Sequence, residues 1–353
     1  MLEIDPRAAK VTWTVFLIGS ALFITYSIRS AILAIIFAIF FAYLLFPLVR
    51  FVERHTPPRF PRTAALVLVF ILVIAGVTIG GALLGNRIVE EAARLAQQLP
   101  KMLDTPNLSQ RVPLPAFLEP ERERFVSFII DQLRSGTGQA LPFAERFGVT
   151  LMHAASNLLY LVLVPILSFL LIKEAPTIKK GALSWLSQSN NTMWILIAED
   201  LSLLLSSYVR ALMLLSIATF ISYSLVLSLL GVPYAALLAS VAAIMEVIPV
   251  VGPIAAGLII LVVSIFSGYD HILWIFGFVL IYRLFQDYAL GPFLMAKGVE
   301  ISSLMVIFGL LAGDELGGIA GIFLSVPVLA AAKIIFVKIQ EKRIPDSQEE
   351  QRR

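Results

Sequence analysis

The stretch A-A-I-M-E-V-I-P-V-V-G-P occupies residues 242–253 and contains Glu246, the one charged residue between Ala211 and Ser267. A charge at membrane depth is costly, so it usually faces a cavity or a polar partner. Helix-breaking residues follow it directly: Pro249, Gly252 and Pro253. Lipid cannot satisfy the backbone groups that such a break frees. The stretch therefore predicts a buried break that lines a transport pathway.

The composition extends this interpretation to the whole chain. Of its 353 residues, 59% are hydrophobic and only 14% are charged, with a mean hydropathy of +0.89. A soluble protein of this length needs far more polar surface. The apolar runs are also too long and continuous for the strands of an outer-membrane barrel. We expect an all-α, polytopic helical integral membrane protein.

Several classes of site are disfavoured by residue content. The chain has no cysteine, and its three histidines, His55, His153 and His271, are far apart and form no H-E-x-x-H pattern. The net charge of +3 is small, and the basic residues lie mainly at span ends. We expect no metal, no cofactor and no nucleic-acid partner.

About eight membrane segments are predicted, two of them interrupted or re-entrant. Six are continuous apolar runs: Val11–Ile28, Ala31–Val52, Thr63–Gly85, Val149–Ile172, Val209–Leu230 and Ile272–Leu290. Two are interrupted: Ala235–Ser267 by the break described above, and Ser303–Phe336 by Gly313–Gly318. The first run is expected to be retained as a span and not cleaved as a signal peptide.

The chain divides into four parts. Residues 1–85 are predicted to form N-terminal transmembrane helices, and 149–343 the transport core. Residues 86–148 form a polar, proline-punctuated helical insertion, which serves either as a solvated connector or as an interaction or lid element. Residues 344–353 are charged and predicted to be disordered.

Lysine and arginine in short loops predict the orientation. Basic clusters follow the second, fourth and last segments, and include Arg50, Arg54, Lys179 and Lys338. These clusters, and both termini, should be cytoplasmic in a bacterial inner membrane. The tight turn that holds Arg29 then lies outside, as does the polar insertion.

Five motifs of the second half give the chain a recognisable pattern. They are S-Y-V-R (Ser207–Arg210), G-V-P-Y-A (Gly231–Ala235), E-V-I-P-V-V-G-P (Glu246–Pro253), Q-D-Y-A-L-G-P (Gln286–Pro292) and G-G-I-A-G-I-F-L-S-V-P (Gly317–Pro327). Weaker matches lie at Phe41–Val49 and Ser168–Glu174. In order and spacing these resemble the AI-2E transporter family, also described as PerM-like permeases.

The resemblance implies a carrier more firmly than it implies a cargo. The family includes proteins assigned to export of a quorum signal and others assigned to sodium–proton antiport. It also often has Gly-Gln where this chain has Ala211 and Leu212, so the resemblance does not identify the cargo. The resemblance also makes a homo-oligomer plausible.

Glu246 is the main candidate for function. Burial favours its protonated form, so it can load and release a proton or cation near neutral pH. The break beside it exposes helix ends and backbone carbonyls. In carriers with discontinuous helices, groups of this kind bind ions. The alternatives are a structural hydrogen-bonded carboxylate and a simple surface loop.

Other polar residues are weaker candidates for substrate or ion binding. Arg283 and Asp287 lie four residues apart on one helix face, with Gln286 beside them, and form either a polar stripe or a structural ion pair. Asp314 and Glu315 are a second ion site if their break is re-entrant. Arg210 is expected near the cytoplasmic start of its span, with its head snorkelling to water.

Two other functions remain open at this stage. An intramembrane aspartyl protease would need two aspartates, and Asp270 and Asp314 only faintly match its motifs. A non-transporting membrane scaffold is the stronger alternative. We predict a secondary active transporter and not an enzyme, exporting a small signal molecule or exchanging cations for protons.

Overall fold

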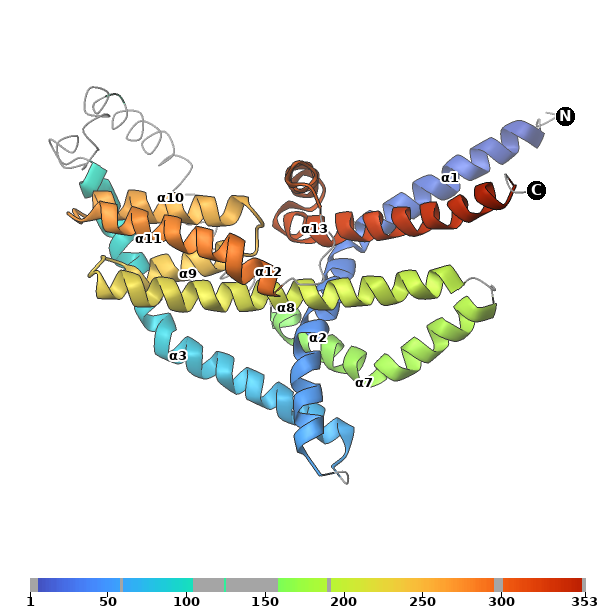
Figure 1. The fold of residues 1–353 in the computed structure, drawn as a ribbon, viewed down its shortest axis with the longest axis horizontal. Helices are drawn as coiled ribbons and strands as arrows, with labels where there is room; N and C mark the ends of the chain where they lie inside the picture. Colours follow the sequence, from blue (N-terminus) through green and yellow to red (C-terminus); the bar gives the residue numbers. More distant parts are fainter. Residues whose placement is uncertain are drawn as a thin grey trace.

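The computed structural model describes residues 6–57, 60–103, 124, 158–188, 192–294 and 301–350, and within these ranges the regular elements are all helices. Figure 1 shows their arrangement. The all-α fold that the sequence predicts is confirmed. The helices are α1 (Pro6–Ser27), α2 (Arg29–His55), α3 (Arg62–Leu103), α7 (Leu158–Gln188), α8 (Thr192–Leu229), α9 (Ala235–Met245), α10 (Val251–Phe266), α11 (Ile272–Phe285), the π-helix η2 (Gln286–Leu290), α12 (Gly291–Leu294) and α13 (Ser303–Glu350).

Five helices of the described chain are long and apolar enough to cross a membrane. They contain the segments Ser30–His55, Arg62–Gln98, Met193–Leu229, Ile272–Leu294 and Gly321–Gln340. Many of their large apolar side chains, such as Ile71, Leu83 and Ile221, are more than half exposed. In water this exposure would be unfavourable, whereas in a bilayer these faces contact lipid. A polytopic membrane protein follows from both the length and the surface of the helices.

The predicted tight turn at Arg29 is wrong. Only Ile28 separates α1 from α2, and helical hydrogen bonds continue across it, from Ile28 N–H to Ile24 O and from Ile32 N–H to Ile28 O. Figure 1 shows α1 continuing into α2 through a bend without reversing. The sequence there contains no Gly, Pro or Asn to reverse the chain, so the helix continues.

Three helices extend beyond the predicted spans. Helix α8 begins at Thr192, not near Val209, and α7 runs to Gln188, past Ile172. Residues 149–157, the predicted start of the fourth span, lie outside the described residues. Helix α13 continues to Glu350, into the segment 344–353 that was predicted to be disordered. Glu, Gln and Lys are good helix formers, which favours this extension.

Helices α9 and α10 form a hairpin that packs on α8 and α11. The two helices contain 11 and 16 residues, about 17 and 24 Å, so each is shorter than a typical span. Tyr269 donates to Leu230 O over 3.0 Å, which joins the two ends of the hairpin at its base. The core between these helices is built by apolar residues that include Leu227, Leu238, Ala239, Ile260 and Ile275.

A second hairpin lies within α13, which folds back at Gly318 (φ 56°, ψ −139°). Its two arms touch closely, because a Cβ at Gly313 would lie 2.5 Å from Gly321 O. The predicted break is therefore confirmed. Figure 1 shows the first part of α13 nearly end-on, while α9 and α10 lie across the view. The two hairpins thus run in different directions.

The N-terminal helices join this assembly through two further apolar clusters. Leu45 and Val49 of α2 pack with Leu66 of α3 and Ile172 of α7. Phe40 of α2 packs with Tyr208 of α8, and Phe323 of α13 packs against them. Helix α2 therefore packs against α3, α7, α8 and the hairpin of α13, which also packs directly on α8 through Leu204 and Ala330.

Candidate functional site

A cavity of about 450 Å³ lies where the tip of the α9–α10 hairpin meets α8, η2 and α13. Six of the nine predicted site residues line it: Glu246, Pro249, Pro253, Arg283, Gln286 and Asp287. The rest of the lining is largely apolar and includes Leu212, Leu215 and Val326. The structure thus brings together two motifs that are about forty residues apart in the sequence.

Glu246 lies at the end of α9, and only 6% of it is exposed. Its Oε1 accepts a hydrogen bond from the Gln286 amide, and its Oε2 accepts one from Thr219 Oγ1 at 3.2 Å. Within the described chain it forms no ion pair. A buried carboxylate that only neutral donors contact is costly when ionised. It is therefore suited to bind a proton or a cation.

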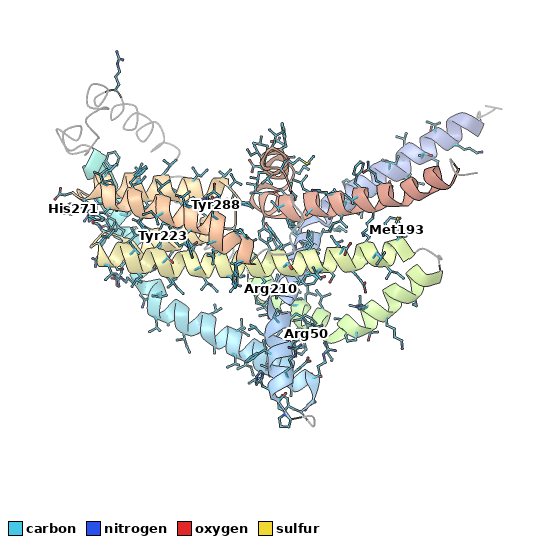
Figure 2. The ribbon with its side chains drawn as sticks, viewed as in Figure 1. Arg50, Met193, Arg210, Tyr223, His271 and Tyr288 are labelled. Carbon is cyan, nitrogen blue, oxygen red and sulfur yellow. The ribbon has the colours of Figure 1, made fainter. Side chains whose placement is uncertain are left out.

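A hydroxyl chain extends from the carboxylate into the helix bundle. Thr219 Oγ1 lies 3.1 Å from Tyr282 Oη, and the Tyr282 ring meets the Tyr223 ring edge to face, with centroids 5.2 Å apart. These three side chains come from α8 and α11 and are all buried. Figure 2 shows Tyr223 on α8, beside α11. The Glu246 carboxylate thus belongs to a hydrogen-bonded network that aromatic side chains enclose in part.

The tip of the hairpin is a strained turn. Val250 has φ 65° and ψ −57°, and Val251 N–H donates to Pro249 O at 2.7 Å, which together define a γ-turn. A β-branched residue with positive φ is an outlier, and such strain often marks a functional site. Gly252 does not line the cavity. It is required by packing, because a Cβ there would lie 1.8 Å from Met245 O.

The opposite wall contains a π-helical turn over Gln286–Leu290. π-turns are rare and frequently lie at functional sites. Arg283 Nε and Asp287 Oδ2 form an ion pair of 2.9 Å across this turn, and both side chains are partly exposed. Gln286 is buried beside them and points its amide to Glu246. The Arg283–Asp287 pair therefore borders the cavity and is not a separate structural pair remote from it.

The remaining predicted residues lie elsewhere. Asp314 and Glu315 are exposed at the turn of the α13 hairpin and do not line this cavity. Asp270, considered for a protease, is exposed between α10 and α11. Arg210 is exposed in the middle of α8, not near its start (Figure 2), because α8 is longer than predicted.

Sequence reasoning missed Thr219, Tyr282 and Val250. Neutral polar residues are common in apolar helices, so neither Thr219 nor Tyr282 stands out. The strain at Val250 appears only in the backbone. A partial signal existed for Tyr282, which lies four residues before Gln286 and so on the same helix face.

Metal ligation finds little support in the described segments. No group of three or more His, Asp or Glu side chains that could hold an ion gathers in them. Glu246 offers a single carboxylate with two neutral neighbours. This arrangement suits one proton or one weakly held monovalent cation better than a tightly bound metal.

Comparisons with known proteins agree with this architecture. Residues 11–341 match the family model of AI-2E family transporters. The AI-2 transport protein TqsA of Escherichia coli is 28% identical over 91% of this chain and 90% of its own. Bacillus subtilis YueF is 28% identical over 83% and 80% of the two chains, and YrrI is 22% identical over 90% and 88%; both are named only as candidate transport proteins.

The resemblance that the motifs suggest is thus confirmed over nearly the whole chain. The match includes the break after Glu246, the π-turn and the glycine-rich turn of α13. This multi-pass membrane protein belongs to the AI-2E family of transporters.

Proposed function

We propose that this permease is a secondary active carrier in which Glu246 binds and releases the coupling proton. The observation that supports this proposal is the burial of Glu246 at a cavity, with no ion pair to it among the described residues, where Arg283 pairs with Asp287 instead. A carboxylate in this position is stable when it is protonated or when a cation is bound to it. It therefore ionises only when a cation replaces the proton. Alternation between these forms would couple proton movement to cargo movement.

For the cargo we propose a small organic molecule that is exported in exchange for protons. A cavity of about 450 Å³ is far larger than a bare cation needs and falls in the usual range for small-molecule sites. Its lining combines apolar side chains with a few polar groups at one end. The name of the Escherichia coli relative, an AI-2 transport protein, also favours an organic cargo.

Cation–proton exchange is the second candidate. Glu246, Asp287 and Arg283 together carry one net negative charge when both carboxylates are ionised, which favours a cation over an anion. The hairpin tip adds backbone groups of the kind that coordinate ions in discontinuous helices. A non-transporting scaffold is the third alternative, and it requires no flux at all.

Reconstitution in proteoliposomes that contain a pH-sensitive dye would distinguish organic-cargo export, cation–proton exchange and a scaffold role. We expect a cargo from a panel of small polar organic molecules to move protons in the opposite direction. Proton movement with sodium or potassium alone would favour cation exchange. Folded protein that moves neither organic molecules nor cations would contradict a carrier and favour the scaffold.

We also propose a bacterial cell membrane location with a cytoplasmic C-terminus. The basic clusters at the α2–α3 turn and along the end of α13 favour the cytoplasmic side for those regions. Because α1 continues into α2 without the reversal that would return the chain to the cytoplasm, the predicted cytoplasmic N-terminus loses its support. Self-association also stays a prediction.

A further inference from the structure

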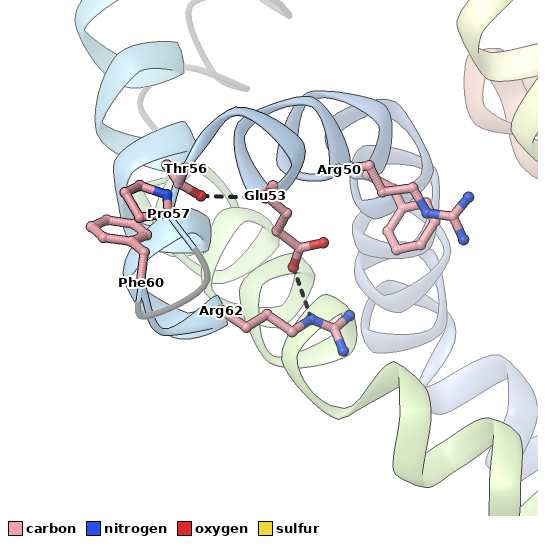
Figure 3. A pocket seen from close by; sticks show the side chains of 7 residues that line it. Arg50, Glu53, Thr56, Pro57, Phe60 and Arg62 are labelled. Carbon is pink, nitrogen blue, oxygen red and sulfur yellow. Dashed lines mark hydrogen bonds and ion pairs between the residues drawn. The ribbon is translucent and has the colours of Figure 1, made fainter.

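A second cavity, of about 470 Å³, lies at the turn between α2 and α3, away from Glu246. Figure 3 shows it from close by. It is lined by Phe46, Arg50, Glu53, Thr56, Pro57, Phe60 and Arg62. None of these residues lines the Glu246 cavity, so this cavity is a separate feature of the fold.

One arginine of this cavity is held in place by the protein. Arg62 Nε lies 3.2 Å from Glu53 Oε1, and its Nη2 donates to Ile172 O at 3.5 Å. The pair neutralises the Glu53 charge, and Arg62 still has donors directed elsewhere. Figure 3 shows Glu53 between Arg62 and Arg50. The carboxylate therefore cannot pair fully with both guanidinium groups.

The other arginine has no anionic partner in the described chain. The Arg50 guanidinium lies 4.5 Å from the centre of the Phe46 ring, and the residue is exposed. Stacking on an aromatic ring orients the planar group and leaves its N–H edge free to bind an anion. The cavity thus carries one uncompensated positive charge on a pre-oriented donor.

The neighbouring helix end does not compete for these donors. The last turn of α2 is capped by Thr56, whose N–H and Oγ1 both donate to Val52 O, at 3.0 and 2.9 Å. His55 Nδ1 contacts Phe51 O at 2.8 Å. Because these carbonyls already have partners, the arginine groups stay available to an external anion.

The position of the cavity identifies the class of anion. Helices α2 and α3 are both long and apolar enough to span a membrane, so the turn that joins them lies at a membrane surface. Phe46 and Phe60 add apolar walls beside the guanidinium groups. A cavity that combines guanidinium donors with apolar walls beside the lipid fits a phosphate group that carries acyl chains.

We infer that this cavity binds the phosphate of an anionic membrane lipid between Arg50 and Arg62. The acyl chains would then lie along exposed apolar faces of the adjoining helices, which carry Leu48 and Phe51. The inference goes beyond transport and does not depend on the proposed role of Glu246. It assigns to this turn a lipid site that anchors the α2–α3 hairpin at the membrane surface.

Native mass spectrometry of the full chain tests this lipid site. The protein is first exchanged into mixed micelles that contain equal amounts of phosphatidylglycerol and phosphatidylcholine. We expect wild-type protein to retain phosphatidylglycerol preferentially. Arg50→Gln should lower that retention about fivefold, which corresponds to the loss of one basic group at a membrane surface. Arg50→Lys should keep part of it. Arg94→Gln, on an exposed pair of α3, is the matched control and should change nothing.

Two results would overturn the inference. One is equal phosphatidylglycerol retention by wild type, Arg50→Gln and Arg62→Gln. The other is displacement of the lipid by millimolar inorganic phosphate, which would identify a site for free phosphate. Because the ring of Phe46 is the one partner of the Arg50 guanidinium among the described residues, Arg50→Gln should fold normally, and its thermal unfolding curve checks this.

Discussion

The amide of Gln286 donates to the Glu246 carboxylate across the boundary between the π-turn and the tip of the α9–α10 hairpin. This bond joins two irregular elements, a strained turn and a π-helix, at one cavity. Movement of the hairpin tip away from η2 would break it. The carboxylate is thus placed where a change in its protonation alters the contact between two helical elements.

Removal of either donor to Glu246 should impair transport. Gln286→Leu or Thr219→Val leaves one buried carboxylate oxygen without its partner, at a cost of about 1 to 3 kcal/mol. We expect at least a several-fold loss of flux in proteoliposomes. Thr219→Ser keeps the hydroxyl and should retain most activity. Full activity in both donor variants would show that the network has no role in the cycle.

Gly252 should be essential for the hairpin. A Cβ at this position would lie 1.8 Å from the backbone oxygen of Met245, which cannot move freely. Gly252→Ala should therefore destabilise the protein by about 3 kcal/mol, seen as a lower melting temperature in detergent. Gly277→Ala is the matched control, because nothing lies within 4 Å of its Cβ. It should be neutral or stabilising by up to about 1 kcal/mol. Equal melting temperatures of the two variants would contradict the packing described here.

Glu91 should hold the start of α9 in place. Its Oε2 accepts a hydrogen bond from Leu237 N–H at 2.9 Å, at the first turn of the helix. Loss of such a cap costs about 1 to 2 kcal/mol. Hydrogen exchange should therefore become faster at Leu237 and its neighbours in Glu91→Ala. Glu90→Ala, which removes only an exposed pair with Arg94, is the control and should leave that exchange rate unchanged.

Six of the nine residues predicted for the site line one cavity, whereas several helix boundaries were misplaced. Glu246 and Pro249 were found because a charge and a helix break in an apolar run are both costly and therefore conspicuous. Thr219 and Tyr282 lie 63 residues apart, and their meeting depends on how α8 packs against α11. The length of α8 was underestimated because Glu199 and Asp200 interrupt the apolar run of its first half. The bend at Ile28 was predicted as a turn because Arg29 and Ser30 separate two apolar runs that are each about long enough for a span.

The topology of the hairpin can be tested at Lys297, which lies outside the described residues. A re-entrant α9–α10 hairpin, followed by one span, places this residue in the cytoplasm, whereas two kinked full spans place it outside. The chain has no native cysteine, so Lys297→Cys gives a single label site. We expect no reaction with an impermeant thiol reagent in intact cells and reaction after permeabilisation. Labelling of intact cells would contradict the re-entrant hairpin.

Proton coupling through Glu246 is the central claim, and proton-coupled flux of Glu246→Gln tests it most directly. The amide keeps the size of the side chain and removes the proton site, so the protein should fold. We expect wild-type flux to change with pH from mildly acid to mildly alkaline conditions. Flux of Glu246→Gln should be small and independent of pH, while Glu90→Gln should behave as wild type. Unchanged, pH-dependent flux in folded Glu246→Gln would contradict this account.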